Sequence, residues 1–139
     1  MPSREKIEQE LINANIKVTD ARYQILHLLH EKQGHYSAEE IHGMLAKMQL
    51  NVGLATIYRT LVQLEAVGLI LRHSFMDGVA VYEINDGDHG HIVCLKCGNI
   101  SEFNDEVINS RQSQIAQELK LEPIRCSHTL YGVCASCAK

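Results

Sequence analysis

The most informative residues in this sequence are four cysteines arranged as two Cys-x-x-Cys knuckles. One knuckle is Cys94 to Cys97 and the other is Cys134 to Cys137, with 36 residues between them. Two thiolates three positions apart on a tight turn can bind one ion, and two such turns complete a tetrahedral shell of four sulfurs. A single knuckle would leave a redox dithiol open, but the pair favours a metal. The spacing therefore predicts a structural Zn(II) site at these four cysteines.

A second group of potential ligands lies immediately before the first knuckle. His89 and His91 precede Cys94, yet a zinc ion that already has four sulfur ligands needs neither imidazole. We therefore expect the two histidines to belong to a second metal site of different composition. The fifth cysteine, Cys126, fits neither pattern. Its default interpretation is a small buried residue, with a redox thiol as the sharper alternative.

The overall composition limits the class of protein. The chain has 139 residues, 45% of them apolar, which is enough for one ordinary domain or two small ones. No apolar run approaches the roughly 20 residues that span a bilayer, and the first ten residues lack a signal-peptide core. Together with the metal-type spacing of the cysteines, these features predict a cytoplasmic protein without a membrane partner.

Charge is distributed unevenly along the chain. The net charge of −4 argues at first against binding to nucleic acid. Residues 1–75, however, hold eight basic and eight acidic side chains, whereas residues 76–139 hold five and nine. The acidity therefore belongs to the C-terminal half, and a DNA-binding face in the N-terminal half is compatible with the total.

Four helices are expected in the N-terminal half. Apolar residues at helical spacing predict the first over residues 4–15 and the second after the N-cap residue Thr19. Ser37 and Glu40 have the spacing of a capping box, which predicts the start of the third. The fourth follows a break at residues 51–53. The predicted core positions of these helices are Ile7, Leu11, Ala21, Ile25, Leu26, Leu29, Ile41, Met44, Leu45, Met48, Leu54, Ile57, Leu61 and Leu64.

The fourth helix carries a predicted DNA-binding face. No acidic side chain appears on this face before Glu65, and its polar groups are of the kind that bond phosphates and base edges. The alternative is an ordinary solvated helix face, but the helices before it and the hairpin after it favour nucleic acid. The expected outer face consists of Thr56, Arg59, Thr60 and Gln63, with Tyr58 at its flank.

A β-hairpin is expected directly after this helix. Residues 69–75 and 79–84 are rich in β-forming side chains and are joined by Met76-Asp77-Gly78, a turn with glycine where a positive φ is expected. Three helices followed by a two-stranded hairpin are typical of a winged helix-turn-helix domain. In such a domain the last helix enters the major groove and the hairpin contacts the backbone.

The C-terminal half is predicted to be a separate small domain. A polar stretch over residues 85–90 is interpreted as a hinge between a DNA-binding domain, 1–84, and a dimerisation and metal-binding domain, 91–139. So small an α+β unit buries little by itself, so zinc and self-association are expected to stabilise it. Its predicted elements are strands at 91–95 and 99–103, a helix at 105–121 and a last strand at 127–133.

Three segments resemble the ferric uptake regulator (Fur) family of bacterial metal-dependent repressors, and the resemblance covers nearly the whole chain. Residues 15–19 (Asn-Ile-Lys-Val-Thr) resemble the entry to the family's second helix, and residues 53–59 (Gly-Leu-Ala-Thr-Ile-Tyr-Arg) resemble its recognition helix. The most specific segment is His-x-His-x-x-Cys-x-x-Cys-Gly at residues 89–98. The resemblance implies an α+β protein that binds double-stranded operator DNA as a homodimer or a higher oligomer.

The resemblance also implies a regulatory metal site with ligands from both domains. Chemically, three imidazoles and two carboxylates suit Fe(II) or Mn(II) better than a thiolate tetrahedron would. No cysteine precedes Cys94, whereas zinc-sensing members of the family use a thiolate in this site. The positions that match the family's ligands are His35, Glu83, His89, His91 and Glu102.

The sequence departs from the family at an accessory metal site. Many members have a longer histidine run, which is shortened here to Asp88-His89-Gly90-His91. Asn109 stands where those members have glutamate, and Cys126 where they have histidine. We therefore expect the accessory site to be missing. The remaining histidines, interpreted as structural or solvated with His73 the best placed to reach a phosphate, are His27, His30, His42, His73 and His128.

The function that the resemblance implies is an Fe(II)-responsive transcriptional repressor of iron-uptake genes, not an enzyme, with Mn(II) as a substitute in vitro. Lys17 would lie near the minor groove or backbone, while Thr56, Tyr58 and Arg59 would meet the DNA from the recognition helix. A peroxide-sensing member is the first alternative, although such sensors typically have aspartate where Glu102 stands. Members that sense zinc or manganese are further alternatives.

Two other classes fit the sequence less well. A zinc-dependent hydrolase or deaminase could use the His-x-His pair, but it would need an open coordination position and a general base. The deaminase signature of His-x-Glu with Pro-Cys-x-x-Cys is absent from the sequence. A zinc-ribbon interaction module without DNA binding would leave the polar face around Arg59 unexplained.

Overall fold

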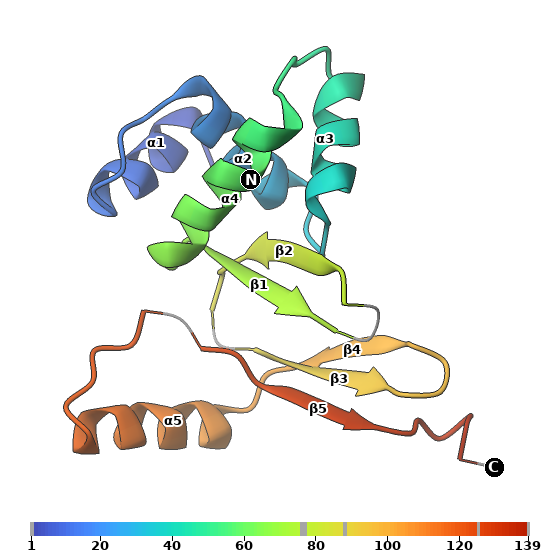
Figure 1. Cartoon of the computed structure of the whole chain (residues 1–139). Coiled ribbons are helices and arrows are strands. Elements are labelled where there is room, and N and C mark those ends of the chain that lie inside the picture. The colour runs from blue at the N-terminus through green and yellow to red at the C-terminus, as the bar shows by residue number, and fades with distance from the viewer. Residues whose placement is uncertain (1, 76–77, 88, 125, 139) are drawn as a thin grey trace. The chain divides into compact units, whose positions relative to one another are not determined.

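The computed structural model begins with four helices, continues with a two-stranded hairpin, and ends with a three-stranded sheet and one more helix (Figure 1). The residues that it describes are 2–75, 78–87, 89–124 and 126–138. Met76 and Asp77 of the predicted turn, and Asp88 of the shortened histidine run, lie outside these residues. None of the described helices combines the length and the apolar character required to cross a membrane.

The chain divides into two compact units. Unit 1 consists of Met1–Ser74 and Gly78–Asn85, and unit 2 consists of Phe75–Asp77 and Asp86–Lys139. Among the described residues, unit 1 consists of four helices and a two-stranded hairpin, and unit 2 of a three-stranded sheet and one helix. The predicted α+β class is confirmed. The two units are described separately below.

Unit 1 has the predicted order of four helices followed by a hairpin. Three of the helices begin at hydroxyl caps, because Ser3, Thr19 and Ser37 each accept a hydrogen bond from a backbone N–H of the first turn. The capping box predicted between Ser37 and Glu40 is present in both directions. The elements are α1 (Arg4–Asn13), α2 (Asp20–Glu31), α3 (Ala38–Lys47), α4 (Leu54–Ala66), β1 (Ile70–Ser74) and β2 (Ala80–Ile84).

Apolar side chains from all four helices and the hairpin form the core of unit 1. Three expectations about this core are wrong. Met48 is exposed because it is the C-cap of α3, where the helical period stops, and Leu54 is 36% exposed at the first position of α4. Thr60 was expected on the outer face, but it is buried because it lies three residues after Ile57 and four before Leu64 on the apolar stripe.

The hairpin of unit 1 is antiparallel, and its register orders the polar residues on one face. His73 on β1 and Glu83 on β2 are diagonal neighbours on the same face. The segment before α3 is attached to this hairpin through Tyr36, whose backbone exchanges two hydrogen bonds with Tyr82 (N···O 3.0 and 2.8 Å). His35 is therefore held beside β2 by its neighbour in the chain.

Unit 2 has the predicted order of strand, strand, helix and strand. Its sheet has the order β4-β3-β5, with β3 antiparallel to β4 and parallel to β5 (Figure 1). Asp105 caps the helix by accepting hydrogen bonds from two backbone N–H groups, and the helix ends three residues before the predicted boundary at 121. The elements are β3 (Gly90–Cys94), β4 (Ile100–Phe103), α5 (Glu106–Glu118) and β5 (Thr129–Gly132).

Gly90 at the start of β3 is required by close packing. A Cβ atom at this position would lie 2.3 Å from Cζ of Phe103, on the neighbouring strand β4. No other residue fits there without displacing the aromatic ring. The glycine between His89 and His91 therefore allows β3 to pair with β4 at the point where the two histidines are presented.

Candidate metal centres and DNA-binding face

The two cysteine knuckles meet because β3 and β5 are parallel neighbours. Cys94, the last residue of β3, pairs with Gly132, the last residue of β5, so each knuckle lies at the same end of the sheet. The Sγ atoms of the four cysteines all lie within 4.8 Å of one another, and those of Cys97 and Cys134 are 3.9 Å apart. Four converging sulfurs fit the tetrahedral shell that structural zinc prefers.

Hydrogen bonds within this cluster shift the pKa values of two of its thiols, Cys94 and Cys137, in opposite directions. The N–H groups of Cys97 and Cys134 point at Sγ of Cys94 (N···S 3.5 and 3.4 Å). These donors stabilise a thiolate and lower the pKa of Cys94 to about 6. Thiol hydrogen bonds to Cys134 and Cys97 raise the pKa of Cys137 to about 12. Of these two thiols, Cys94 is therefore the readier to bind a metal ion as a thiolate, whereas binding by Cys137 requires displacement of its proton.

In unit 1, Glu83 is the centre of a buried group with two histidines. Its Oε2 lies 2.9 Å from Nε2 of His35, and its Oε1 lies 2.7 Å from Nε2 of His73. The side chain of Glu83 is 6% exposed and that of His73 is 3% exposed. This corrects the interpretation of His73 as a residue that reaches a phosphate. The alternation of β1 places His73 on the same face as Leu71. The contact of His73 with Glu83, however, follows only from the hairpin register, which the sequence does not reveal.

In unit 2, the pairing of β3 with β4 assembles the other predicted ligands. His91 stands directly opposite Glu102 in the ladder, and its Nε2 lies 3.9 Å from Oε1 of that carboxylate. The rings of His89 and His91 meet edge to face with their centroids 5.0 Å apart. His91 is 1% exposed, whereas Glu102 is exposed. Two imidazoles and one carboxylate are thus gathered within this unit.

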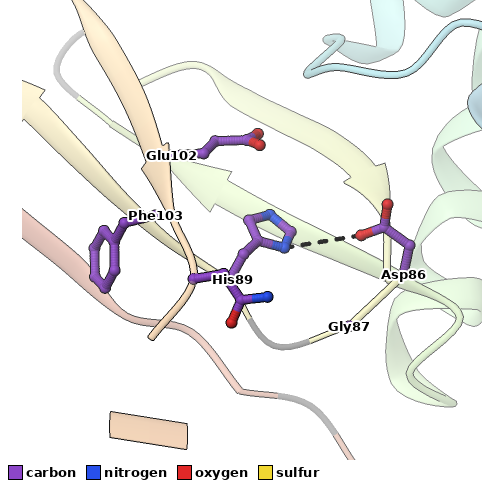
Figure 2. Close-up of a pocket in the computed structure, with 6 residues that line it drawn as sticks. Asp86, Gly87, His89, Glu102 and Phe103 are labelled. Carbon is purple, nitrogen blue, oxygen red and sulfur yellow. Dashed lines mark ion pairs between the residues drawn. The ribbon is translucent and has the colours of Figure 1, made fainter. Parts of the chain in front are cut away.

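A pocket of about 400 Å³ opens beside these residues (Figure 2). Figure 2 shows the ring of His89 with Asp86 on one side and Glu102 on the other, and Nδ1 of His89 lies 3.8 Å from Oδ1 of Asp86. Asp86 belongs to the polar stretch that the sequence predicts only as a hinge. Imidazole nitrogens and carboxylate oxygens are donors for Fe(II), Mn(II) and Zn(II). The lining residues are Asp86, Gly87, His89, Glu102, Phe103 and Asn104.

The five predicted regulatory ligands are therefore distributed over both units. His35 and Glu83 are together in unit 1, and His89, His91 and Glu102 are together in unit 2. Within each unit the donors converge, and their chemistry fits a metal that accepts mixed nitrogen and oxygen ligands.

The residues at the accessory-site positions make contacts with other side chains. Asn109 donates to Oδ1 of Asn104 at 2.8 Å, and Sγ of Cys126 lies 3.2 Å from Oε1 of Gln112. Cys126 is exposed, so the expectation of a small buried residue is wrong. Its position after α5, in a segment that precedes β5, leaves its side chain at the surface.

The predicted DNA-contact residues lie on the outside of unit 1. Lys17 and Arg59 are exposed, Tyr58 is 41% exposed, and Thr56 is half-buried. The hydroxyl of Tyr58 donates to the carboxylate of Glu39 on α3. This bond lowers the pKa of Glu39 and raises the pKa of Tyr58. The tyrosine ring is thereby held by a neighbouring helix.

Arg22 on α2 links two of the predicted DNA-contact segments. Its guanidinium donates to Oε1 of Gln63 on α4 (3.0 and 3.2 Å) and to the backbone carbonyl of Lys17 (2.7 Å). The sequence predicts no role for Arg22, because a basic residue in the first turn of a helix carries no signal of its partners. Arg22 fixes the position of the segment before α2 relative to α4 within unit 1.

A winged helix-turn-helix with a polar outer face on α4, together with a four-thiol cluster and histidine–carboxylate groups, is typical of a metal-binding transcription regulator. Residues 13–131 match the Ferric uptake regulator family, and the chain belongs to this family. It is 40% identical to the ferric uptake regulation protein of Legionella pneumophila over 131 residues, which cover 93% of this chain and 96% of that protein. Proteins of this family are transcription regulators.

Solved structures agree with this assignment. The ferric uptake regulator of Pseudomonas aeruginosa, solved with manganese, has a TM-score of 0.79 and 40% sequence identity, covering 93% of this chain and 98% of that one. The regulator of Francisella tularensis, solved with iron, has a TM-score of 0.64 and 36% identity, covering 89% and 96%. The resemblance deduced from the three segments is thus confirmed at the level of family and fold.

Proposed function

We propose that this chain is an Fe(II)-responsive repressor that binds operator DNA of iron-uptake genes when a metal ion is held jointly by its two units. The observation that carries the proposal is the distribution of ligands. His35 and Glu83 converge in unit 1, while His91 and Glu102 converge in unit 2. Neither unit alone offers the full set of five donors, so metal binding couples the two.

The donor types support iron as the sensed metal. Imidazoles and carboxylates favour Fe(II) or Mn(II), whereas the four thiols favour zinc in a structural role. Relatives solved with manganese and with iron are consistent with this division. Glu102, where peroxide sensors of the family typically have aspartate, favours the iron-responsive reading over that alternative.

Coupling of the two units gives the metal its regulatory effect. His35 and Glu83 bind from the DNA-binding unit, and His89, His91 and Glu102 bind from the other, so the ion supplies a bridge between them. Such a bridge restricts the arrangement of the winged helices and favours the one that fits two half-sites about one helical turn apart. A coupling free energy of about 1–3 kcal/mol is typical of allosteric sites.

The edge strand β5 of unit 2 supports the proposal that the chain self-associates. β5 lies at the edge of the sheet, and its residues Leu130 and Tyr131 are about half exposed. An edge strand with exposed apolar side chains, whose outer side has no neighbouring strand among the described residues, is suited to pairing with a second copy. We therefore propose a homodimer joined through unit 2, which presents one winged helix to each half-site.

Recognition of DNA is assigned to α4 and to the segment before α2. Arg59 and Tyr58 are exposed on α4, and Thr56 lies one turn before Thr60 on the same helix. Lys17 lies on the segment that Arg22 fixes against α4. We propose that the α4 residues meet base edges in the major groove and that Lys17 makes an electrostatic contact.

The proposal is tested by gel shift with duplex fragments from promoters of iron-uptake genes. Protein purified without oxygen is assayed with and without added Fe(II) or Mn(II) at matched salt, and its metal content is measured. We expect retardation that requires the added metal and zinc that remains bound throughout. Binding that does not depend on metal, or no binding to any fragment, would contradict the repressor function.

A further inference from the structure

We infer that His73 positions Glu83 for the regulatory metal, a residue role outside the five-ligand set. The inference rests on the proposed function, because it concerns the same metal site. Its geometry lies wholly within unit 1. His73 Nε2 is 2.7 Å from Oε1 of Glu83, while His35 Nε2 is 2.9 Å from Oε2 of the same carboxylate.

The backbone explains why these side chains meet. His73 and Glu83 occupy diagonal positions on one face of the β1–β2 hairpin. His35 is brought to the same place by Tyr36, which is bonded through its backbone to Tyr82, the neighbour of Glu83. The three side chains are therefore held by the hairpin ladder and one bridge, not by flexible loops.

The two oxygens of Glu83 have separate partners, and this separation defines the role of His73. A carboxylate that binds a metal ion is ionised and only accepts hydrogen bonds, so we assign to Nε2 of His73 the hydrogen that it donates to Oε1. When His35 and Oε2 of Glu83 bind a metal ion, the bond from His73 to Oε1 can remain. It fixes the rotation of the carboxylate and satisfies the oxygen of a side chain that is only 6% exposed.

Loss of such a partner has a known size of effect. Groups that orient a metal ligand through a hydrogen bond typically change metal affinity by about 10–100-fold when they are removed. His73→Leu removes the donor while keeping an apolar side chain in the buried position. His73→Gln keeps an N–H donor that can reach the place of Nε2.

A matched control exists in the same unit. His30 Nε2 lies 3.0 Å from Oε2 of Glu10, so this pair resembles the His73–Glu83 pair in chemistry and length. It joins α2 to α1 and contains none of the five proposed ligands. His30→Leu therefore removes a histidine–glutamate contact without touching the metal site.

The experiment is a titration of the zinc-loaded full chain with Mn(II), followed by the electron paramagnetic resonance signal of free Mn(II). Zinc content and thermal unfolding before Mn(II) addition are measured for every variant. We expect His73→Leu to bind Mn(II) about 10–100-fold more weakly than the parent. His73→Gln should recover most of this loss, and His30→Leu should bind like the parent.

The outcomes separate this inference from the proposed function. If the parent binds no Mn(II) beyond its zinc, the proposed function fails and the inference fails with it. If the parent binds and His73→Leu binds equally well, the inference alone is overturned. It is also overturned if His73→Gln is as weak as His73→Leu, since His73 would then be a ligand itself, or if His30→Leu weakens binding to the same extent.

Discussion

Unit 1 and unit 2 bury apolar surface to very different extents. All sixteen buried residues of the core cluster belong to unit 1. In the described part of unit 2, the buried apolar residues are Val93, Cys94 and Ala116, and eleven of the seventeen exposed large apolar side chains of the described residues lie in this unit. Unit 1 thus has the core of an independent domain. Unit 2 needs other sources of stability, which we assign to zinc and to a second copy.

This difference in buried apolar core gives the two units different roles in the proposed metal-dependent switch. The proposed DNA-contact residues lie on a unit that its own core stabilises, so we expect their positions within that unit not to depend on metal. The unit with the four thiols has little core and is expected to depend on its ion. Loss of metal should therefore unfold unit 2, whereas truncation of core side chains should destabilise unit 1. The predictions below test whether the two effects are separate.

The largest effect is expected from loss of a zinc thiolate. Cys94→Ser should lose zinc, dimerisation and the fold of unit 2 together, because structural zinc sites contribute on the order of 10 kcal/mol to folding. Unit 1 should retain its helical circular dichroism. The measurements are zinc content, sedimentation and circular dichroism, with Cys126→Ser as the matched control that keeps all three. A folded, dimeric and zinc-free Cys94→Ser protein would overturn the assignment.

Truncation of a core side chain should lower the free energy of unfolding of unit 1. The decrease should be smaller than that caused by loss of zinc from unit 2, and it should be the same with and without metal. Leu61 is fully buried on α4, so Leu61→Ala should lower the free energy of unfolding by about 2–5 kcal/mol. Val62 is the next residue and is 63% exposed, so Val62→Ala should stay within about 0.5 kcal/mol of the parent. Denaturant unfolding with and without a zinc chelator measures both. If the chelator changed the cost of Leu61→Ala markedly, the two units would not be independent in stability.

Substitutions on the outer face of unit 1 should alter DNA binding while leaving the core intact. Arg59→Ala should weaken operator binding by about 1–3 kcal/mol and relax specificity, because a guanidinium can read a guanine edge with two hydrogen bonds. Lys17→Ala should instead reduce the magnitude of the slope of log K against log[salt] by about one, as expected for a phosphate contact. Filter binding at several salt concentrations distinguishes the two. Parent-like binding by both variants would refute the proposed docking.

The smallest effect concerns the acidity of one thiol in unit 2. In reduced, metal-free protein that circular dichroism shows to have kept the strands of unit 2, the first thiolate should appear near pH 6, because backbone N–H groups lower the pKa of Cys94 to about 6. A lowered pKa means that this thiolate stabilises the fold above the ordinary thiol pKa of about 8.5 and that the contribution is lost as the pH falls through 6. Ultraviolet thiolate absorbance measures it. The absorbance transition near pH 6 should be absent from Cys94→Ser. A single transition near pH 8.5 in the parent would refute the lowered pKa of Cys94.

Much of the fold follows from local signals in the sequence. Hydroxyl caps and apolar periodicity predict the helices of unit 1, since Thr19 and Ser37 act within one turn of their own positions. Errors arise where two signals compete. Thr60 is polar by type, yet its spacing from Ile57 places it on the apolar stripe, and burial of the stripe prevails. Met48 lies one residue beyond the end of α3, where periodicity no longer applies.

The candidate sites were predictable only as far as spacing carries information. Cysteine spacing indicates that Cys94 and Cys134 share an ion, but the parallel pairing of β3 with β5 that brings the knuckles together is a long-range contact. The role of His73 depends on the hairpin register, which a sequence leaves open, so the sequence alone predicts only a structural or solvated histidine that could reach a phosphate. Likewise, the partners of Arg22 lie on other segments.

The most direct test of the central claim is an operator titration against Mn(II) for the parent and for His91→Ala, with zinc content measured in both. His42→Ala, which changes an exposed histidine on α3, is the control. If one metal ion is held by ligands from both units, DNA binding of the parent and of the control should rise with Mn(II). His91→Ala should show no metal response while keeping its zinc, its fold and its dimer. A His91→Ala protein that responds to Mn(II) like the parent would contradict the account.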